Sequence, residues 1–473
     1  MNHRFLLFGL PVLLAAQGIT VNDPSRNWAA TVPEPPIPRV SAGQSFLSFY
    51  GHKVTRITDT RSSSDGGSWM HYYSDRSPLS RNSTYLLCHG PGGSTWVQPL
   101  NGSSFRGSAW SVYSDHERPQ SIGQSIWSPG DDEVLYFIGD RVQLWMINAR
   151  TRKKKMIRDF SKEIAKGSYK EGYLRVQFAS KDGKRLSMDY MRESKEAFGI
   201  LLYDVETNTA RMHLGDRLRQ KSPVPINSSF RLAGSGAEKD GAFLFVQENG
   251  NAINGSSGNP QEAANTYTYV VPWNEDALGS GKSLSGVFAT NHGAALSKGN
   301  VRISGNESGY YINNVDWLFS MRRADLTKEP TAADKWRFPY RDIFHWPYST
   351  GTGAHVSSGG ISDDWLALSL YQESSCGQRI RTPLSNEIIM LSANGEAIYD
   401  EKTHRIVKNG DIHRLTHHYS YPEDCEKPVP YWGQPHAAIS MDGKYVVFTS
   451  TFGRSGRTDV FMVTLPKHLT PKM

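Results

Sequence analysis

Short apolar runs, each entered through a small polar turn, recur along the whole chain. Seven segments share the pattern, which in its fullest form reads Ser-x-Asp-Gly-Lys before a strand-like run: residues 80–87, 128–137, 180–186, 239–246, 297–303, 362–368 and 440–448. Turn residues followed by a short apolar run are typical of a hairpin turn that enters a β-strand. Seven copies spaced roughly 50 to 80 residues apart predict an all-β chain folded as one seven-bladed β-propeller of four-stranded sheets.

The first residues predict a secreted protein. Met1 to Arg4 is a short basic start, Phe5 to Ala16 is apolar, and small residues follow, which is typical of a secretory signal peptide. The apolar run is too short to span a bilayer; a buried first strand is the alternative. We therefore expect a signal peptide over 1–18, an extended proline-rich lead-in over 19–42 and the propeller over 43–473. Five glycosylation sequons fit export: Asn82, Asn101, Asn227, Asn254 and Asn306.

The cysteines bear on disulfide pairing, and the net charge bears on the kind of molecule that the protein binds. Cys376 and Cys425 lie in polar, loop-like segments and are expected to pair, which leaves Cys88 as a buried free thiol; a different pairing stays open. The formal net charge of +7 favours an anionic partner such as an acidic polysaccharide. The basic run 152–155 lacks interleaved aromatic residues and is interpreted as a solvated turn, so no nucleic-acid partner is expected. We expect no membrane partner and a monomer.

Polar residues recur where each inner strand should enter the central channel. His292, His355 and His436 hold the same place in three consecutive repeats and should converge on one face of the channel. A single such histidine is more often structural, but three in register favour a functional cluster. Other polar residues expected at this mouth are His71, Tyr72, Gln124, Arg175, Gln177, Arg231 and Gln434.

Neutral imidazoles and an amide oxygen suit a divalent cation. The sequence predicts a site formed by His355, His436 and Gln434 with one of His413 or His417, for zinc, manganese or calcium. A catalytic role for the histidines without a metal is equally consistent with the residues. No organic cofactor is expected.

Arginine, histidine and tyrosine around one mouth fit β-elimination on a uronic acid. That reaction needs a cation for the carboxylate, a base for the C5 proton and an acid for the leaving oxygen. We assign the cation to Arg231 or Arg175, and the base and acid to His292 and His71 with help from Tyr72 or Tyr190. Expected substrate contacts come from Gln177, Gln124, Tyr348, Tyr431 and Trp432. No paired carboxylates stand out at the expected ring positions, which disfavours glycoside hydrolysis, and the sequence has no Gly-x-Ser-x-Gly segment, which disfavours serine hydrolase chemistry.

The propeller phrases, the segment from His436 to Ser450 and the His355 segment resemble the β-propeller polysaccharide lyases. These include oligogalacturonate lyases, ulvan lyases and the fungal L-rhamnose-α-1,4-D-glucuronate lyases that act on gum arabic. The resemblance implies a substrate at the mouth, an arginine that neutralises the carboxylate and histidine or tyrosine as acid and base. The oligogalacturonate members also hold a divalent metal with late-blade histidines and a glutamine.

Two departures from the oligogalacturonate pattern bear on the substrate. The last-blade motif has only His436, where those enzymes have two alternating histidines, and the fourth blade reads Phe245-Val246-Gln247-Glu248 without their strand-end histidine. The signal peptide and sequons are most similar to the fungal branch. We therefore expect a terminal rhamnosyl-glucuronate unit of gum arabic or arabinogalactan as substrate. A non-catalytic, lectin-like propeller is the main alternative, and it would repeat equal aromatic and polar pockets in every blade.

Overall fold

The computed structural model describes most of the chain. Described are residues 23, 25–59, 68–74, 76–90, 94–113, 125–165, 172–180, 182–191, 197–214, 230–234, 243–247, 267–271, 286–288, 294–297, 301–307, 311–312, 316–325, 339–349, 352–357, 364–372, 383–400, 402–403, 405–420, 433–453 and 457–470. The predicted signal peptide and the Cys376–Cys425 pair lie outside these residues. Cys88 is a buried free thiol, as predicted.

Within the described residues, the sheets follow one another along the chain. The first combines β3 (Tyr85–His89), β4 (Thr95–Asn101), β5 (Ser104–Phe105) and β6 (Trp110–Ser111). The second has the order β7 (Ser125–Trp127), β8 (Val134–Gly139), β9 (Gln143–Asn148) and β10 (Lys154–Asp159), and helix α1 (Ser161–Ala165) follows it. The third has the order β11 (Tyr173–Ala179), β12 (Arg185–Met191), β13 (Ala197–Asp204) and β14 (Thr209–Leu214).

The later sheets repeat this plan. The fourth is β15 (Phe230–Gly234), β16 (Phe243–Gln247), β17 (Tyr267–Val271) and β18 (Gly286–Phe288). The fifth is β19 (Ala294–Ser297), β20 (Val301–Glu307), β21 (Tyr311–Ile312), β22 (Asp316–Asp325) and β23 (Tyr340–Ser349), with β21 and β23 both paired to β22. The sixth is β24 (Thr352–Ser357), β25 (Trp365–Gln372), β26 (Glu387–Ser392) and β29 (Ile412–His417), and the hairpin of β27 (Ile398–Asp400) and β28 (Arg405–Lys408) lies between its last two strands in sequence.

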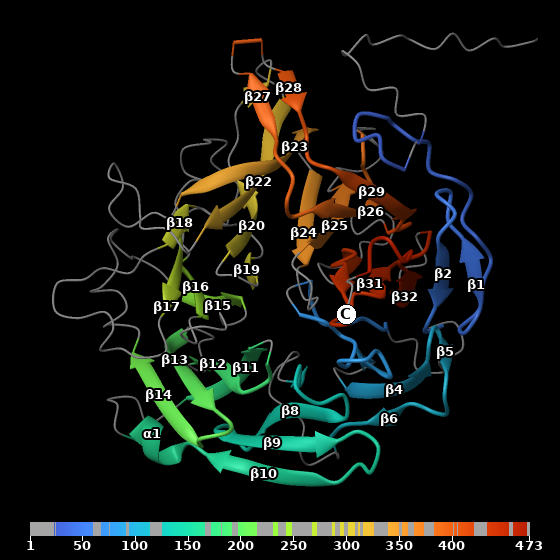
Figure 1. Cartoon of the computed structure of the whole chain (residues 1–473). Coiled ribbons are helices and arrows are strands. Elements are labelled where there is room, and N and C mark those ends of the chain that lie inside the picture. The colour runs from blue at the N-terminus through green and yellow to red at the C-terminus, as the bar shows by residue number, and fades with distance from the viewer. Residues whose placement is uncertain are drawn as a thin grey trace, which may run out of the picture.

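The last sheet joins the two ends of the chain. Its order is β1 (Ser45–Leu47), β2 (Lys53–Arg56), β32 (Asp459–Thr464), β31 (Tyr445–Ser450) and β30 (Ala438–Ile439). β2 pairs antiparallel with β32, so that Val54 lies opposite Val463. Side chains strengthen this join, because Arg56 forms a buried ion pair with Asp459, which also accepts a 2.9 Å hydrogen bond from Thr58. The sheets surround a common centre as in a β-propeller, with β11, β15, β19 and β24 on the inner side (Figure 1).

The repeated phrase forms the turn that was predicted from it. In the third sheet, Ser180 accepts a 3.0 Å hydrogen bond from the Arg185 N–H, and Asp182 accepts one of 3.0 Å from the Lys184 N–H. In the last sheet, Ser440 and Asp442 bind the Tyr445 and Lys444 N–H groups in the same way, at 3.0 Å and 3.1 Å. The serine and aspartate thus satisfy the turn amides immediately before the strand begins.

These turns also tie neighbouring sheets together. Asp132, in the turn of the second sheet, accepts a 2.8 Å hydrogen bond from Ser80 in the turn of the first. Asp442, in the turn of the last sheet, accepts a 2.9 Å hydrogen bond from Ser83. The polar residues of the phrase therefore stabilise sheet-to-sheet contacts as well as single turns.

Gly183 makes the closest of these approaches, and we expect Gly183→Ala to destabilise the fold. Its φ is +74°, and an added Cβ would lie 2.5 Å from the backbone nitrogen of Gly130. Strain and overlap together should lower the free energy of unfolding by about 2 kcal/mol or more. Gly51→Ala is the matched control, because Gly51 has a φ of +81° with nothing within 4 Å of an added Cβ. Urea unfolding of both variants separates the cost of strain from that of the sheet contact; equal costs would contradict the expectation.

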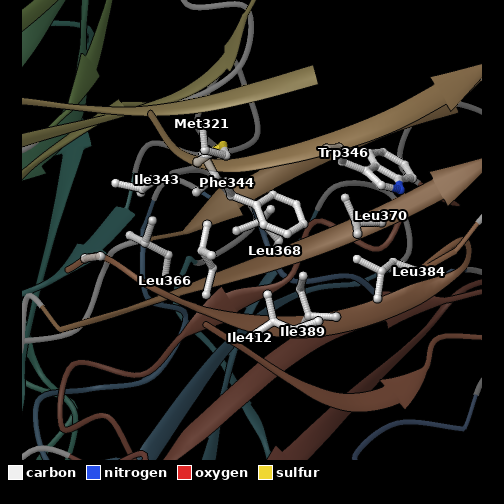
Figure 2. Close-up of a cluster of buried hydrophobic side chains, with 14 residues drawn as sticks. Met321, Ile343, Phe344, Trp346, Leu366, Leu368, Leu370, Leu384, Ile389 and Ile412 are labelled. Atoms are coloured by element: carbon white, nitrogen blue, oxygen red, sulfur yellow. The ribbon is translucent and has the colours of Figure 1, made fainter. Parts of the chain in front are cut away.

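Apolar side chains fill the spaces between sheets. Figure 2 shows Met321 and Phe344 of the fifth sheet packed against Leu366, Leu368 and Leu370 of β25. Ala367, on the same strand, contributes instead to the cluster shared with the last sheet. This alternation buries both faces of β25. The all-β prediction is confirmed, and within the described residues no helix is long and apolar enough to cross a membrane.

Candidate active site

One irregular segment carries the centre of the site. Residues 68–74 run beside the first sheet, where the backbones of Met70 and His89 exchange hydrogen bonds of 2.9 Å and 2.7 Å and Trp69 N–H donates to Thr458 at 2.9 Å. These contacts fix the segment although it forms only an isolated bridge. Its consecutive residues Tyr72 and Tyr73 contact two different polar groups, and they thereby link the two groups.

The first group brings together the late-chain residues predicted from the repeat. Nε2 of His355, on the inner strand β24, is 2.7 Å from Oε1 of Gln434. The rings of His355 and His436 have centroids 4.2 Å apart. Tyr73 lies against both, with its hydroxyl 3.2 Å from Nδ1 of His355 and its ring centroid 4.7 Å from that of His436. The predicted convergence of His355 and His436 is therefore observed.

The hydrogen bonds define the proton positions in this group. An amide oxygen only accepts hydrogen bonds, so with Gln434 oriented as observed, Nε2 of His355 is the donor. In neutral imidazole the other nitrogen is then an acceptor, and Nδ1 receives the hydroxyl proton of Tyr73. The resulting chain from Tyr73 through His355 to Gln434 can move a proton from the phenol to the imidazole.

Backbone contacts hold Gln434 and His436 in place. His436 has a φ of +43°, in the left-handed region that non-glycine residues seldom adopt. On either side, the Thr449 N–H donates to the Pro435 carbonyl at 2.9 Å and the Ala437 N–H donates to Ser369 at 3.2 Å. Strain of this kind persists only where the surroundings enforce it, and it is concentrated at functional sites.

The second group centres on Arg76. Its guanidinium carbon lies 4.1 Å from the ring centroid of Tyr72, and its Nη2 donates a 2.6 Å hydrogen bond to Gln177. Gln177 in turn donates to Asp189 at 2.6 Å, and Arg175 donates to the same Asp189 oxygen at 2.7 Å. Asp189 is fully buried and forms an ion pair with Arg175. Burial by itself would lower the pKa of Arg175, but the charge of Asp189 helps to raise it. Arg76 donates to the amide of Gln177 and lies over the ring of Tyr72, so it brings a guanidinium next to the segment that carries Tyr72 and Tyr73.

His89 lies close enough to Arg76 for the guanidinium charge to affect its pKa. Burial, followed by the smaller effects of the nearby His71 and Arg76, lowers the pKa of His89 to about 3. His71 is itself buried beside this group. His89 is therefore neutral at physiological pH.

Stability should fall in mild acid because of buried neutral histidines. Burial lowers the pKa of both His89 and His418 to about 3, whereas an unfolded histidine titrates near 6.5. His418 is locked as neutral, since Nε2 lies 3.1 Å from the Leu370 carbonyl and Nδ1 accepts the Ser420 N–H at 3.0 Å. Each depressed pKa adds stability that is complete above pH 6.5 and is lost as the pH falls toward 3.

The expected slope is up to about 1.4 kcal/mol per pH unit for each such histidine. Urea midpoints measured from pH 7.5 to pH 5 should decrease steadily below about 6.5. His418→Gln should reduce this slope while lowering the midpoint at pH 7.5. A midpoint that is constant over the whole interval would contradict the expectation.

The structure separates several other predicted residues from this centre. His413 and His417 lie on β29, three strands outward from His355 in the same sheet, or about 14 Å at ordinary strand spacing. They cannot complete a ligand set with His355 and His436, so that part of the prediction is wrong. Tyr348 lies on β23, outside β22 in its sheet and away from the inner strand β19.

Tyr190 also has a different role from the predicted one. It is buried in the hydrophobic cluster that contains Leu174 and Val176, between the second and third sheets. Its strand β12 places it on the face opposite to Asp189, because successive strand residues alternate. The assignment of Tyr190 to the acid–base machinery is therefore replaced by a packing role.

The remaining candidates are only partly placed. Arg231 lies in β15 with its backbone opposite Val246. His292, Gln124, Tyr431 and Trp432 lie outside the described residues. Sequence reasoning selected His71 and Tyr72 from the stretch 69–76 but missed Arg76 and the role of Tyr73, because this stretch lacks the repeat phrase that would assign each of its positions a place in a strand. The one available signal was the density of aromatic and charged residues over 69–76.

The donors around His355 suit a divalent metal ion in chemical type. Two imidazoles, the Gln434 oxygen and the Tyr73 hydroxyl converge within one group, and nitrogen and oxygen donors of this kind bind zinc or manganese. A cluster of three or more His, Cys, Asp or Glu arranged for a metal is not present in the described part of the chain. The fit therefore depends on the glutamine and tyrosine oxygens joining the two histidines.

Comparison with solved structures identifies the class of fold. An oligogalacturonate lyase in complex with manganese is similar over 91% of this chain and 100% of its own, with a TM-score of 0.53 and 14% identity. The oligogalacturonate lyase of Vibrio parahaemolyticus is similar over 90% and 97%, with a TM-score of 0.54 and 12% identity. No protein-family model and no curated protein sequence matches the chain. The chain is thus a β-propeller that shares its fold with the oligogalacturonate lyases.

Proposed function

We propose that this protein is a polysaccharide lyase that cleaves an acidic oligosaccharide next to a uronic acid by β-elimination. We assign one blade to each of the seven sheets of four or five strands. The observation that carries the proposal is that two consecutive residues link a cation to a proton-transfer pair: Tyr72 contacts Arg76, and Tyr73 contacts His355. A cation and a proton-transfer pair are the two parts that this reaction requires.

Arg76 is the group that neutralises the substrate carboxylate. A guanidinium presents a planar fork of N–H donors that matches a carboxylate. Its charge favours loss of the C5 proton, because the negative charge that develops at C5 spreads onto the carboxylate. Hydrogen bonds from Arg175 to Asp189, from Gln177 to Asp189 and from Arg76 to Gln177 hold the guanidinium of Arg76 in position.

Tyr73 and His355 carry the proton. Tyr73 passes its phenol proton to Nδ1 of His355, and the phenolate then removes the C5 proton. The C5–H electron pair forms the C4–C5 double bond as the C4–O4 bond breaks. The regenerated phenol delivers the proton to O4, and His355 returns its own proton to Tyr73. A divalent ion on His355, His436 and Gln434 would take the one lone pair that His355 uses in this relay. It would therefore supply positive charge for the carboxylate as an alternative to the relay, not in addition to it.

The substrate and setting are finer parts of the proposal. The absence of a strand-end histidine after Phe245 supports a glucuronate chain, and we propose rhamnosyl-glucuronate units of gum arabic or arabinogalactan. We also propose that residues 1–18 direct secretion, and that the mature protein acts as an extracellular monomer. The net charge of +7 supports an acidic polymer as partner.

Product formation tests the function directly. The purified chain is incubated with gum arabic, ulvan and oligogalacturonate, with and without added manganese. An unsaturated uronide, detected by ultraviolet absorbance and mass, is the expected product. Binding to these polymers without any unsaturated product would favour a carbohydrate-binding propeller and overturn the lyase proposal.

Tyr73→Phe should stop the reaction while keeping the ring. The change removes only the hydroxyl that lies 3.2 Å from His355, so packing against His436 is retained. Loss of a positioned acid–base group should lower kcat about 10²- to 10⁴-fold. Tyr371→Phe is the control, because the Tyr371 ring also stacks on His355, with centroids 5.0 Å apart. Similar kcat values for the two variants would remove Tyr73 from the mechanism.

A further inference from the structure

A second group of imidazoles lies away from the active site, where three distant parts of the chain meet. His52 lies just before β2, His413 is on β29, and His468 belongs to the segment that follows β32. The group therefore joins the sixth sheet to both strands that close the ring. None of these residues contributes to the proposed reaction.

The geometry of the group places ring nitrogens face to face. Nε2 of His52 is 3.0 Å from Nε2 of His413. The His52 and His413 ring centroids are 5.0 Å apart, and those of His413 and His468 are 5.1 Å apart. Two imidazole nitrogens bound to one tetrahedral zinc ion would lie roughly 3.3 Å apart, given bonds of about 2.0–2.1 Å. The His52–His413 pair is within a few tenths of an ångström of that spacing.

The outer hydrogen bonds orient the pair. His52 forms a hydrogen bond with the backbone of Arg414, and this bond raises the pKa of His52. A bond with that effect is one in which a ring N–H of His52 is the donor. A metal-binding histidine commonly donates its other N–H to a backbone carbonyl in this way. Nδ1 of His413 is buried with no hydrogen-bond partner among the described residues.

The groups around His413 keep its imidazole neutral. The carboxylate of Asp23 favours positive charge at His413, whereas Arg26 and the other two histidines oppose it. Burial is the largest of the effects that keep His413 neutral, with a pKa of about 4. Neutral imidazoles are the form that binds transition metals.

We propose that His52, His413 and His468 bind a divalent transition-metal ion such as zinc, which clips the closed ring. His52 and His413 form the prearranged pair. The described part of the chain has no cluster of three residues already arranged for a metal. Binding of the ion therefore requires the exposed His468 to turn its ring inward as the third ligand. The site is separate from the group around His355, and it stabilises the joined ends of the chain.

Zinc titration of the full chain tests the clip. The starting protein carries His436→Gln, so that binding at the active site does not contribute. Calorimetry should show one zinc bound per chain, and zinc should raise the midpoint of thermal unfolding. Adding His52→Gln or His468→Asn should weaken binding roughly tenfold or more and reduce the thermal shift. His468→Asn changes an exposed side chain and leaves the core intact, so it serves if the His52→Gln variant fails to fold.

Two outcomes would overturn the clip. One is that zinc neither binds nor stabilises the His436→Gln protein. The other is that binding is unchanged when His52 and His468 are both replaced. Lyase activity is not measured in this experiment, so its result is independent of the proposed function.

Discussion

A protein in which Arg76 is replaced by lysine is expected to lose about 10²- to 10³-fold in kcat on the proposed uronide substrate. Lysine keeps the charge but loses the planar fork that binds a carboxylate through two donors. The shorter reach of its charge also removes the contact of the guanidinium with Tyr72, which is 4.1 Å from the ring centroid. Turnover is measured with the unsaturated product, and circular dichroism shows whether the fold is intact.

Arg158→Lys is the matched control for this change. Arg158 also lies over two aromatic rings, those of Phe160 at 5.6 Å and Tyr203 at 5.8 Å, and it is paired with Glu163. It belongs to the outermost strand of the second sheet, far from the centre. Arg158→Lys should therefore cost stability but leave kcat within a few-fold. If Arg76→Lys retains comparable activity, Arg76 does not bind the carboxylate.

Arg175 separates positioning from direct contact. The sequence suggested Arg175 as the neutralising cation, but its guanidinium is held by the buried carboxylate of Asp189. In the proposed mechanism it is a positioning residue that acts through Gln177 and Arg76. The proposal therefore gives the neutralising role to Arg76, which is linked to Arg175 through the hydrogen bonds of Gln177 and Asp189.

The regular part of the fold was predictable because the polar residues of each turn phrase themselves stabilise the turn that precedes a strand. The serine and aspartate at 180 and 182, and again at 440 and 442, bind the amides that a tight turn leaves unpaired. The turn phrases also allowed the repeats to be aligned with one another. His355 and His436 occupy corresponding places in that alignment, and their rings are in contact in the structure.

The errors have a common cause. A strand of a propeller has similar alternation whether it lies at the inner or the outer edge of a blade, so the pattern around His413 and His417 did not reveal that β29 is outermost. Tyr73 and Arg76 were missed for a different reason. Their segment is fixed by single backbone contacts, such as that between Met70 and His89, which leave no periodic signal in the sequence.

The buried ion pair of Glu387 and Arg414 sets the second large expectation. Both side chains are essentially inaccessible, and Nε of Arg414 donates to Glu387 at 2.6 Å while Nη2 contacts the other carboxylate oxygen. Nη1 of Arg414 donates to the carbonyls of Asn27 and Ala30 at 3.1 Å and 2.8 Å. The pair therefore holds the N-terminal lead-in against β26 and β29.

Glu387→Gln should lower the free energy of unfolding by about 3–5 kcal/mol, because it leaves a buried guanidinium without its counter-charge. Urea unfolding measures the loss. Glu396→Gln is the control: Glu396 forms a 2.6 Å pair with Lys408, but both side chains are about half exposed. Water screens such a pair, so its loss should cost no more than about 1 kcal/mol. Equal costs for the two variants would mean that burial does not determine how strongly the Glu387–Arg414 pair holds the lead-in in place.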